Sequence, residues 1–294
     1  MKMTMRKYAV WLGSVFPFAA VISVLALGLS GQATWGDDEK KFSEEAKAAS
    51  ETKKQEIVHE LKTLKAHAWA GKYHYGDGLG VNVDLSLAPG SGFVFTWHGC
   101  LGLYDLNYGG VEEADGRVRL IFKYPNDREG FQGVAPEIIP VVWGERHYLI
   151  PADGVVEFAN AINAGFEPSR TVSRRFLLRN GDEHKAVHGQ PNIPAAYSAY
   201  LLKQPIKAEI TSIKERRIEN SARIITVVLN AGGAQGVRKG MEFYVYSPSN
   251  IFESARVTRV DSSRSEARII QYEADEKYGR PATNWKMSTF VGRD

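Results

Sequence analysis

The sequence predicts a mainly β protein of the α+β class, with an N-terminal helix, an antiparallel β meander or barrel that includes one helix, and a small C-terminal β-barrel. Apolar and polar residues alternate with a period of two in many short segments between residues 71 and 190 and again after residue 207, and turn residues separate these segments. Between residues 37 and 70, by contrast, there is no glycine or proline, which favours a helix.

Residues 1–33 predict an export segment. Lys2, Arg6 and Lys7 precede a long uncharged apolar run, which is typical of a signal peptide. Residues 8–30 are also long enough to cross a bilayer, and residues 31–33 are small enough for cleavage, so a cleaved signal peptide and a retained inner-membrane anchor are both compatible with the sequence. In either form we expect the rest of the chain to lie outside the cytoplasm, in the periplasm or cell envelope.

The charge balance argues against a nucleic-acid partner. The net charge of +3 comes from Lys2, Arg6 and Lys7. The exported part is therefore neutral, and we expect it to contact a membrane only through an uncleaved N-terminal segment. Because Cys100 is the single cysteine, the chain has no internal disulfide.

Residues 34–70 predict a helical spacer. Ile57, Leu61 and Leu64 form an apolar stripe at helical spacing, but only in its second half. We therefore expect the first half to be a solvated stalk and the second half to pack on another element. The repeat is too short and too rich in alanine to favour a coiled-coil dimer, and the sequence leaves the oligomeric state open.

Residues 71–190 predict the first β domain. Alternation over residues 81–87 and 93–98 indicates a hairpin, and residues 117–122 continue the meander. Two short strands around Gly144, a helix that stops at Gly165 and one more strand complete the domain. The large side chains expected on the inner face of the sheet are Phe93, Phe95, Trp97, Leu120 and Phe122.

The segments "GKY", "LSLAPGSGF", "GGV" and "GRVRL" resemble the meander of small lipocalin-like barrels over residues 71–124. The resemblance implies a closed or partly closed sheet, but no site residue, because such barrels share a shape and not a site motif. A hollow barrel would hold an apolar ligand against the five inner-face side chains. Small barrels are usually filled by their own side chains, which is the interpretation that we favour.

Pro191, Pro194 and Pro205 mark residues 191–206 as a linker, and residues 207–294 predict a second β domain. Strands are expected in "ARIITVVLN", "MEFYVYS", "ARVTRV" and "EARII", and the tail adds at most a short strand. This region resembles the small Greek-key barrels of envelope assembly proteins, such as those of the rod-shape protein MreC and of the C-terminal domain of the flagellar protein FlgT. The resemblance, which implies protein contact or assembly in the envelope, rests on Asn230, Gly233, Gly236, Val237, Gly240 and Met241.

Two histidine-containing segments could carry chemistry. On a regular strand His98 and Cys100 would point the same way, as a thiol nucleophile and its base must. Gly99 interrupts the alternation and no orienting Asn or Asp is near in sequence, so we expect core packing, with Cys100 as a small buried hydrophobe. His184 and His188 have metal-ligand spacing only on a helix, and their surroundings predict a loop.

We therefore expect a non-catalytic bacterial envelope protein, not an enzyme, that acts in binding or in assembly as a scaffold. An envelope protein is the expected partner, and we expect no cofactor and no metal. The alternative is a carrier or sensor of an apolar small molecule inside the first β domain. A hydrolase that uses Cys100 and His98 is the least favoured interpretation.

Overall fold

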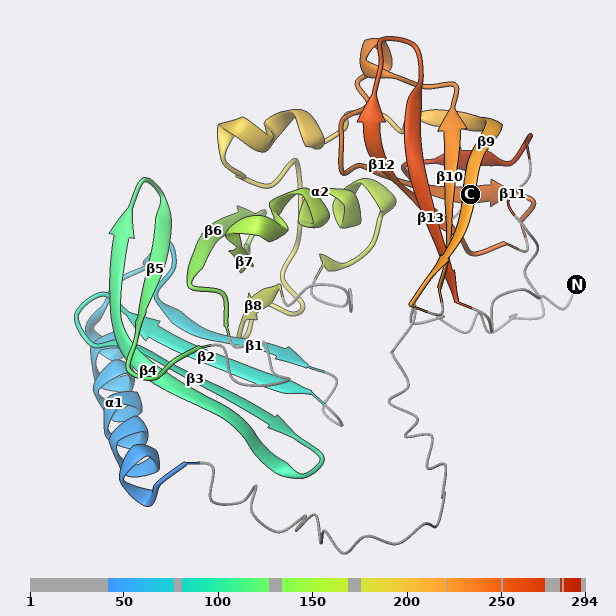
Figure 1. Ribbon diagram of the computed structural model, residues 1–294. Helices are drawn as coiled ribbons and strands as arrows, with labels where there is room; N and C mark the ends of the chain where they lie inside the picture. The colour runs from blue at the N-terminus through green and yellow to red at the C-terminus, as the bar shows by residue number, and fades with distance from the viewer. Residues whose placement is uncertain are drawn as a thin grey trace, which may run out of the picture.

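The computed structural model describes residues 42–76, 81–126, 134–168, 176–220, 222–249, 251–272, 281 and 283–291. These residues form two closed antiparallel β-barrels, of eight and six strands, together with two α-helices (Figure 1). The mainly β class and the barrel-like organisation predicted from the sequence are confirmed. The predicted export segment lies outside the described residues, and within them neither helix is long and apolar enough to cross a membrane.

Barrel 1 is built from eight strands that pair in sequence order. They are β1 (Gly71–Gly76), β2 (Asn82–Ala88), β3 (Gly92–Gly99), β4 (Gly102–Ala114), β5 (Arg117–Phe122), β6 (Glu137–Trp143), β7 (Arg146–Pro151) and β8 (Leu177–Arg179). Pairing of Tyr73 with Arg179 joins β8 to β1 and closes the barrel. The predicted meander is therefore present, and the last strand completes it.

Glycines at a bend in the sheet allow β4 to pair with both β3 and β5. Its first half pairs with β3 as far as Gly109, and its second half pairs with β5 from Gly109 onward. A Cβ atom on Gly109 would lie 1.9 Å from the carbonyl oxygen of Ile121, and one on Gly92 would lie 1.9 Å from that of Gly109. Because real contacts are never so short, the close approach of the strands at this bend requires glycine.

Helix α1 (Glu44–Thr63) lies on the outer face of β2, β3 and β4 (Figure 1). Its buried Ile57 packs against Ala88 and Val94. Ala46 and Ser50 are buried as well, so the prediction that the first half is a solvated stalk is wrong. The helix ends at Thr63 and does not run to residue 70, because the chain turns there to bring Trp69 into the interior cluster of the barrel.

Helix α2 (Val155–Ala164) covers the opposite side of barrel 1. Val155, Phe158 and Ala159 pack against outward-facing residues of β6, β7 and β8. The helix ends at Gly165, whose φ of +78° is the left-handed conformation that glycine adopts at low cost. Within the predicted linker, Ala195–Tyr200 form a short 3-10 helix beside α2, in agreement with the short helical run expected between Pro194 and Pro205.

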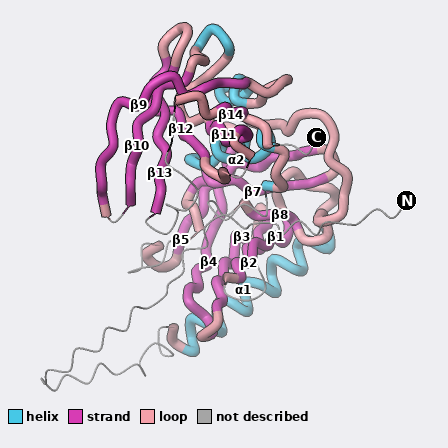
Figure 2. The backbone as a smooth tube through the Cα atoms, turned by 90° about the vertical axis from the view of Figure 1, so that its right-hand side faces the viewer, coloured by secondary structure: helices cyan, strands magenta, loops and turns pink. Residues whose placement is uncertain are grey.

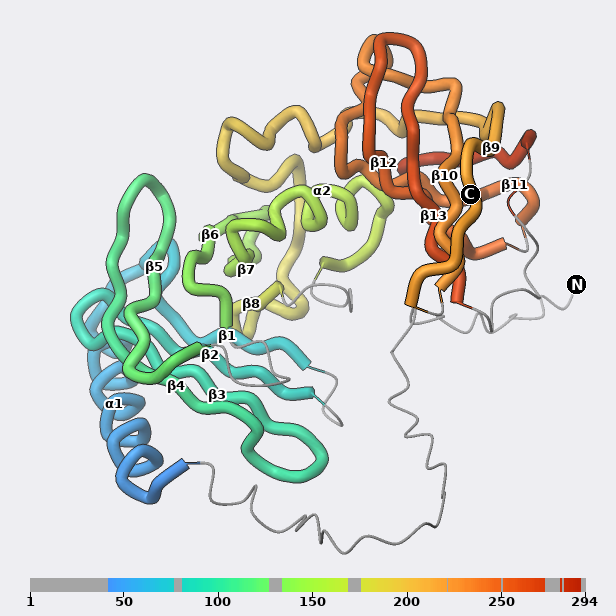
Figure 3. Tube along the Cα trace, in the orientation of Figure 1, coloured from blue at the N-terminus to red at the C-terminus, as the bar shows by residue number. Residues whose placement is uncertain are grey.

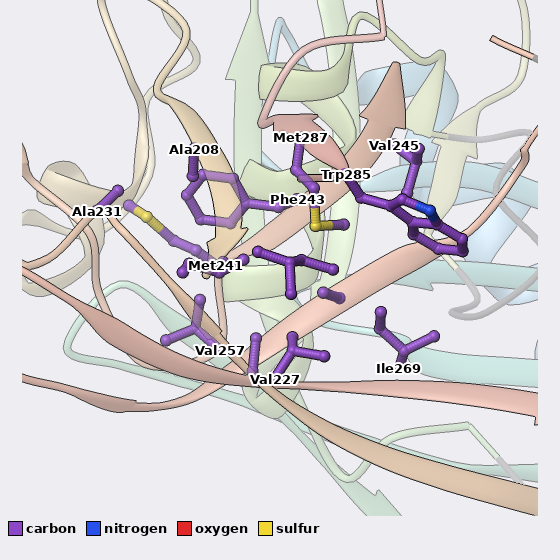
Figure 4. Packing of buried hydrophobic residues seen from close by; sticks show 14 of the residues in the cluster. Ala208, Val227, Ala231, Met241, Phe243, Val245, Val257, Ile269, Trp285 and Met287 are labelled. Carbon is purple, nitrogen blue, oxygen red and sulfur yellow. The ribbon is translucent and has the colours of Figure 1, made fainter. Parts of the chain in front are cut away.

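Barrel 2 has six strands in an order that departs from a simple meander: β10, β13, β12, β11, β14 and β9. Their bounds are β9 (Lys207–Glu219), β10 (Ala222–Leu229), β11 (Glu242–Ser247), β12 (Ser254–Val260), β13 (Ser265–Tyr272) and β14 (Lys286–Ser288). Figure 4 shows Met241, Phe243 and Met287 converging in its interior, and all three have no exposed surface. The short tail strand β14 is essential to closure because it bridges β11 and β9.

Strand β9 was not among the predicted strands. It pairs with β14 only through Lys207–Glu209, yet its ladder with β10 continues as far as Glu219. As a result β9, β10 and β13 run side by side beyond the barrel as a three-stranded arm (Figures 2 and 3). The charged run Lys214–Arg217 on this arm hides the period-two pattern that would identify a half-buried strand.

Candidate functional site

The five side chains predicted to line the first barrel come together in its interior. Phe93 and Phe95 are fully buried, Leu120 and Trp97 are 2% and 7% exposed, and Phe122 is half-buried. The rings of Phe93 and Phe122 meet edge to face, with centroids 5.4 Å apart. The five side chains therefore share the inner face of the sheet, as the alternation of the sequence predicts. Binding of an apolar ligand to them stays a prediction.

A set of polar contacts connects β1 to β8 where these strands close barrel 1. The guanidinium of Arg179 lies 5.4 Å from the centroid of the Tyr73 ring, and its Nη2 donates to the Tyr73 hydroxyl at 2.9 Å. That hydroxyl in turn donates to the carbonyl of Trp69 at 3.0 Å. Burial raises the pKa of Tyr73 to about 12, so its hydroxyl stays neutral at physiological pH and can donate this hydrogen bond.

The stretch around the only cysteine is not core. His98 is exposed at the end of β3, and Cys100 is exposed in the turn that leads to β4. The prediction that both pack in the core is therefore wrong. The β3–β4 hairpin extends beyond the barrel, and a register shift between Trp97 and His98 breaks the alternation that the prediction assumed.

His184 and His188 are exposed in the loop after β8, as the surrounding glycine and proline indicate. In the part of the chain that the structure describes, no three His, Cys, Asp or Glu side chains are arranged to hold a metal ion.

A cluster of charged side chains on β7 holds neighbouring loops in place. The backbone nitrogen and Nδ1 of His147 both lie 2.8 Å from Oδ2 of the buried Asp182. The hydroxyl of Tyr148 donates to Glu167 at 2.8 Å, and Arg146 also pairs with Glu167. Burial alone would raise the pKa of Asp182, but hydrogen bonds from Lys185 and His147 outweigh burial and hold that pKa below its ordinary value.

Helix α2 also contacts barrel 2. Asn160 Nδ2 donates to the carbonyl of Gly240 at 2.9 Å, and its Oδ1 accepts from the backbone nitrogen of Glu242 at 3.3 Å. Arg256 of β12 lies 3.6 Å from Glu157, and the rings of Phe166 and Tyr244 meet edge to face. Glu157 and Asn160 are both buried, so α2 connects the two barrels through buried polar contacts, and we call this contact the joint at α2.

The arm of barrel 2 carries large apolar side chains in solvent. Ile225 and Ile269 point into the barrel and are fully buried, whereas the next residues in alternation, Ile224 and Ile270, face outward. Ile224 is paired with Ile270 across the strands. Gln271 Nε2 donates to Glu253 at 2.7 Å, so the segment that holds Phe252 passes close to the end of β13, where Tyr272 lies.

We call Ile224, Phe252, Ile270 and Tyr272 the outer apolar face. Phe252, Ile270 and Tyr272 are 73%, 52% and 42% exposed. A sequence signal for this face exists, because "RIIT" and "RIIQ" each place two apolar residues in succession, and one of the two must point outward on a strand. The sequence prediction did not single out these residues.

Comparisons with protein-family models, with curated proteins and with solved structures find no match for this chain.

Proposed function

We propose that this protein is a non-catalytic bacterial envelope protein that acts in binding or assembly, and that it binds another protein through the outer apolar face of barrel 2. The observation that carries the proposal is the exposure of Phe252, Ile270 and Tyr272 on one face of a sheet. Large apolar side chains that are scattered singly over a surface are common, but a group of them exposed together often marks a site of interaction with another molecule. The envelope location rests on the export segment predicted at residues 1–33.

Charges beside the face favour an acidic partner. Arg217 and Arg268 flank Ile224 and Ile270 on the same face of the sheet, as the pairing of Ile224 with Arg217 and of Thr226 with Arg268 requires. Arg217 lies 3.2 Å from Glu219 and 3.8 Å from Glu215, so its charge is balanced within β9, whereas Arg268 is exposed and forms no ion pair with a described residue. A partner with an apolar centre and carboxylates at its rim complements this arrangement.

The joint at α2 supports a scaffold role. Because buried polar contacts connect α2 to barrel 2, the outer apolar face is held in a fixed relation to barrel 1. The resemblance of barrel 2 to the small barrels of MreC and FlgT points to the same class of function, protein contact during envelope assembly.

Site-specific photo-crosslinking tests the proposal. A benzoyl-phenylalanine residue replaces Ile270 in the full chain, expressed in its native host. The matched control replaces Ile218, which is 75% exposed on the opposite face of the same arm. We expect position 270 to crosslink to one protein that position 218 does not reach, and that purified protein to bind the wild-type chain but not Ile270→Asp. Equal crosslinks from both positions, or none from 270, would contradict the proposal.

The apolar-carrier alternative rests on a different observation, the gathering of the five predicted inner-face side chains in one interior cluster. Native mass spectrometry of the full chain, isolated gently from its host, separates the two functions. A bound small molecule that Phe95→Ala removes would support a carrier. A chain that carries no added mass other than a partner protein would rule the carrier out.

A further inference from the structure

A second possible binding surface lies on barrel 1, between α1 and the sheet that it covers. A groove of about 480 Å³ runs along the first half of α1, over the outer faces of β1, β2, β3 and β4. Its volume is within the range of small-molecule sites. The polar residues that line it are Lys47, Ser50, Glu51, Lys54, Lys72, Asp84, Ser86, Thr96, His98 and Asn180.

Two ammonium groups in this groove have no counter-ion among the residues that the structure describes. Lys47 pairs with Glu44 at 2.9 Å, and Asp84 pairs with His74 at 3.0 Å. Neither Lys54 nor Lys72 forms an ion pair with a residue that the structure describes. Lys72 is on β1 and Lys54 is on α1, so two separate elements direct positive charge to the groove.

Two serine hydroxyls from different elements also line the groove. Ser50 of α1 and Ser86 of β2 are only 6% and 8% exposed, and both line the groove. The described residues provide no hydrogen-bond partner for either side chain. Ser86 is paired with Lys72 across the strands, so the two side chains leave the same face of the sheet side by side. Both hydroxyl oxygens reach solvent in the groove, where a bound polar molecule can replace water as their hydrogen-bond partner.

The remaining lining suits a molecule that has both hydroxyl groups and apolar C–H surface. Asp84 and Glu51 offer carboxylate acceptors, and Asn180 offers an amide. Val94, Leu103 and Leu106 form an apolar strip beside these groups. A sugar ring presents hydroxyls along its edge and C–H groups on its face, and an attached acid group would pair with the two lysines.

We propose that this groove binds an acidic sugar, whose carboxylate or phosphate group pairs with Lys54 and Lys72 and whose hydroxyl groups bond with Ser86 and Asp84. The site is separate from the barrel interior and from the outer apolar face of barrel 2. A test of sugar binding in this groove is therefore independent of a test of protein binding at the outer apolar face.

Saturation-transfer NMR with the full chain provides the test. The probes are glucuronate, glucose 6-phosphate and neutral glucose, each up to about 10 mM, because small polar ligands bind open sites weakly. We expect saturation transfer to at least one acidic sugar, with affinity about tenfold above that of glucose, since charge-assisted hydrogen bonds are the stronger ones. Whether glucuronate or glucose 6-phosphate binds more tightly identifies the acid group.

Variants then locate the binding. Lys54→Met with Lys72→Met should reduce affinity for the acidic sugar about tenfold or more and leave the melting temperature unchanged. Lys65→Met removes an exposed lysine outside the groove and should change nothing. Absence of binding of both acidic sugars, or equal binding by the double variant and the wild type, would overturn the proposal.

Discussion

Helices α1 and α2 cover most of the outward-facing apolar residues of barrel 1, with Ile121 of β5 as an exception, whereas those on the arm of barrel 2 face solvent. Val94 lies under α1 and Ile139 lies under α2, while Ile224 and Ile270 have no such cover among the described residues. Buried aromatic and aliphatic side chains cluster in the interiors of both barrels. The two barrels therefore differ in how much of their outer apolar surface is covered, and this difference is the reason to place protein binding on barrel 2.

The two helices differ as well. α2 buries seven of its ten residues and contacts both barrels, whereas α1 buries three of twenty and packs on β2, β3 and β4 of barrel 1. A helix buried between two bodies couples them, and a helix on one surface can leave a groove at its side. The following predictions test these two comparisons.

The largest effect is expected from the interior of barrel 1. Phe95→Ala removes a fully buried ring and should lower the free energy of unfolding by about 3–5 kcal/mol. Phe252→Ala removes a ring that is 73% exposed and should change it by less than about 0.5 kcal/mol. Urea denaturation of both variants measures the contrast. Similar losses for the two would show that Phe252 is part of a packed core.

Asn160→Ala tests the joint at α2. It removes two hydrogen bonds to the backbone of barrel 2 and leaves buried groups without partners, so we expect a loss of about 1–3 kcal/mol. Calorimetry should also show the unfolding of the two barrels beginning to separate. Asn192→Ala is the control, because Asn192 is exposed and its side chain makes no described hydrogen bond. A single unshifted transition for Asn160→Ala would mean that the joint does not couple the barrels.

Glu60→Gln tests how α1 is held. The Glu60 carboxylate accepts from the backbone nitrogens of Gly90 at 2.9 Å and Ser91 at 2.6 Å, in the β2–β3 turn. Partial burial would raise the pKa of Glu60, but these hydrogen bonds outweigh it and lower the pKa. The stabilisation is thus present above the ordinary pKa of about 4.3 and is lost as the pH falls through the lower folded value.

We expect Glu60→Gln to lower the free energy of unfolding by about 1 kcal/mol at neutral pH. The free energy of unfolding of the variant should also fall less steeply than that of the wild type between roughly pH 5 and pH 3. Thermal melts across that pH range measure both effects. Glu56→Gln is the control, since Glu56 pairs with Lys53 on the exposed side of the same helix. An unchanged pH profile for Glu60→Gln would show that this contact does not hold α1.

The smallest effect on folding is expected at the outer apolar face. Ile270→Ser should change the free energy of unfolding by less than about 0.5 kcal/mol, because Ile270 is 52% exposed. Its effect should appear in solubility and in partner binding. A loss above about 2 kcal/mol in denaturation would identify the residue as a packing contact instead.

Much of the fold could be predicted because strand alternation is a local property. The inner face of Phe93, Phe95 and Trp97 follows directly from a period of two. Strand β9 was missed because its second half projects from the barrel and carries charge on both faces. Cys100 was misplaced because its burial depends on where the β3–β4 hairpin ends relative to the barrel, which alternation does not determine.

The candidate sites were less predictable. The groove beside α1 combines Lys54, far along a helix, with Lys72 and Ser86 on two strands, and only their packing brings them together. The exposure of Ile270 likewise depends on the absence of a covering helix on that side of the described barrel 2.

The sequence by itself determined the β class, the inner faces of the strands, and the end of α2 at Gly165, because each depends on residues a few positions apart. The tertiary structure alone decided which distant strands close each barrel, with β8 returning to β1 and β14 joining β11 to β9. It also decided which outer faces are covered. Both depend on contacts between segments far apart in the chain, where the close packing of side chains selects one arrangement.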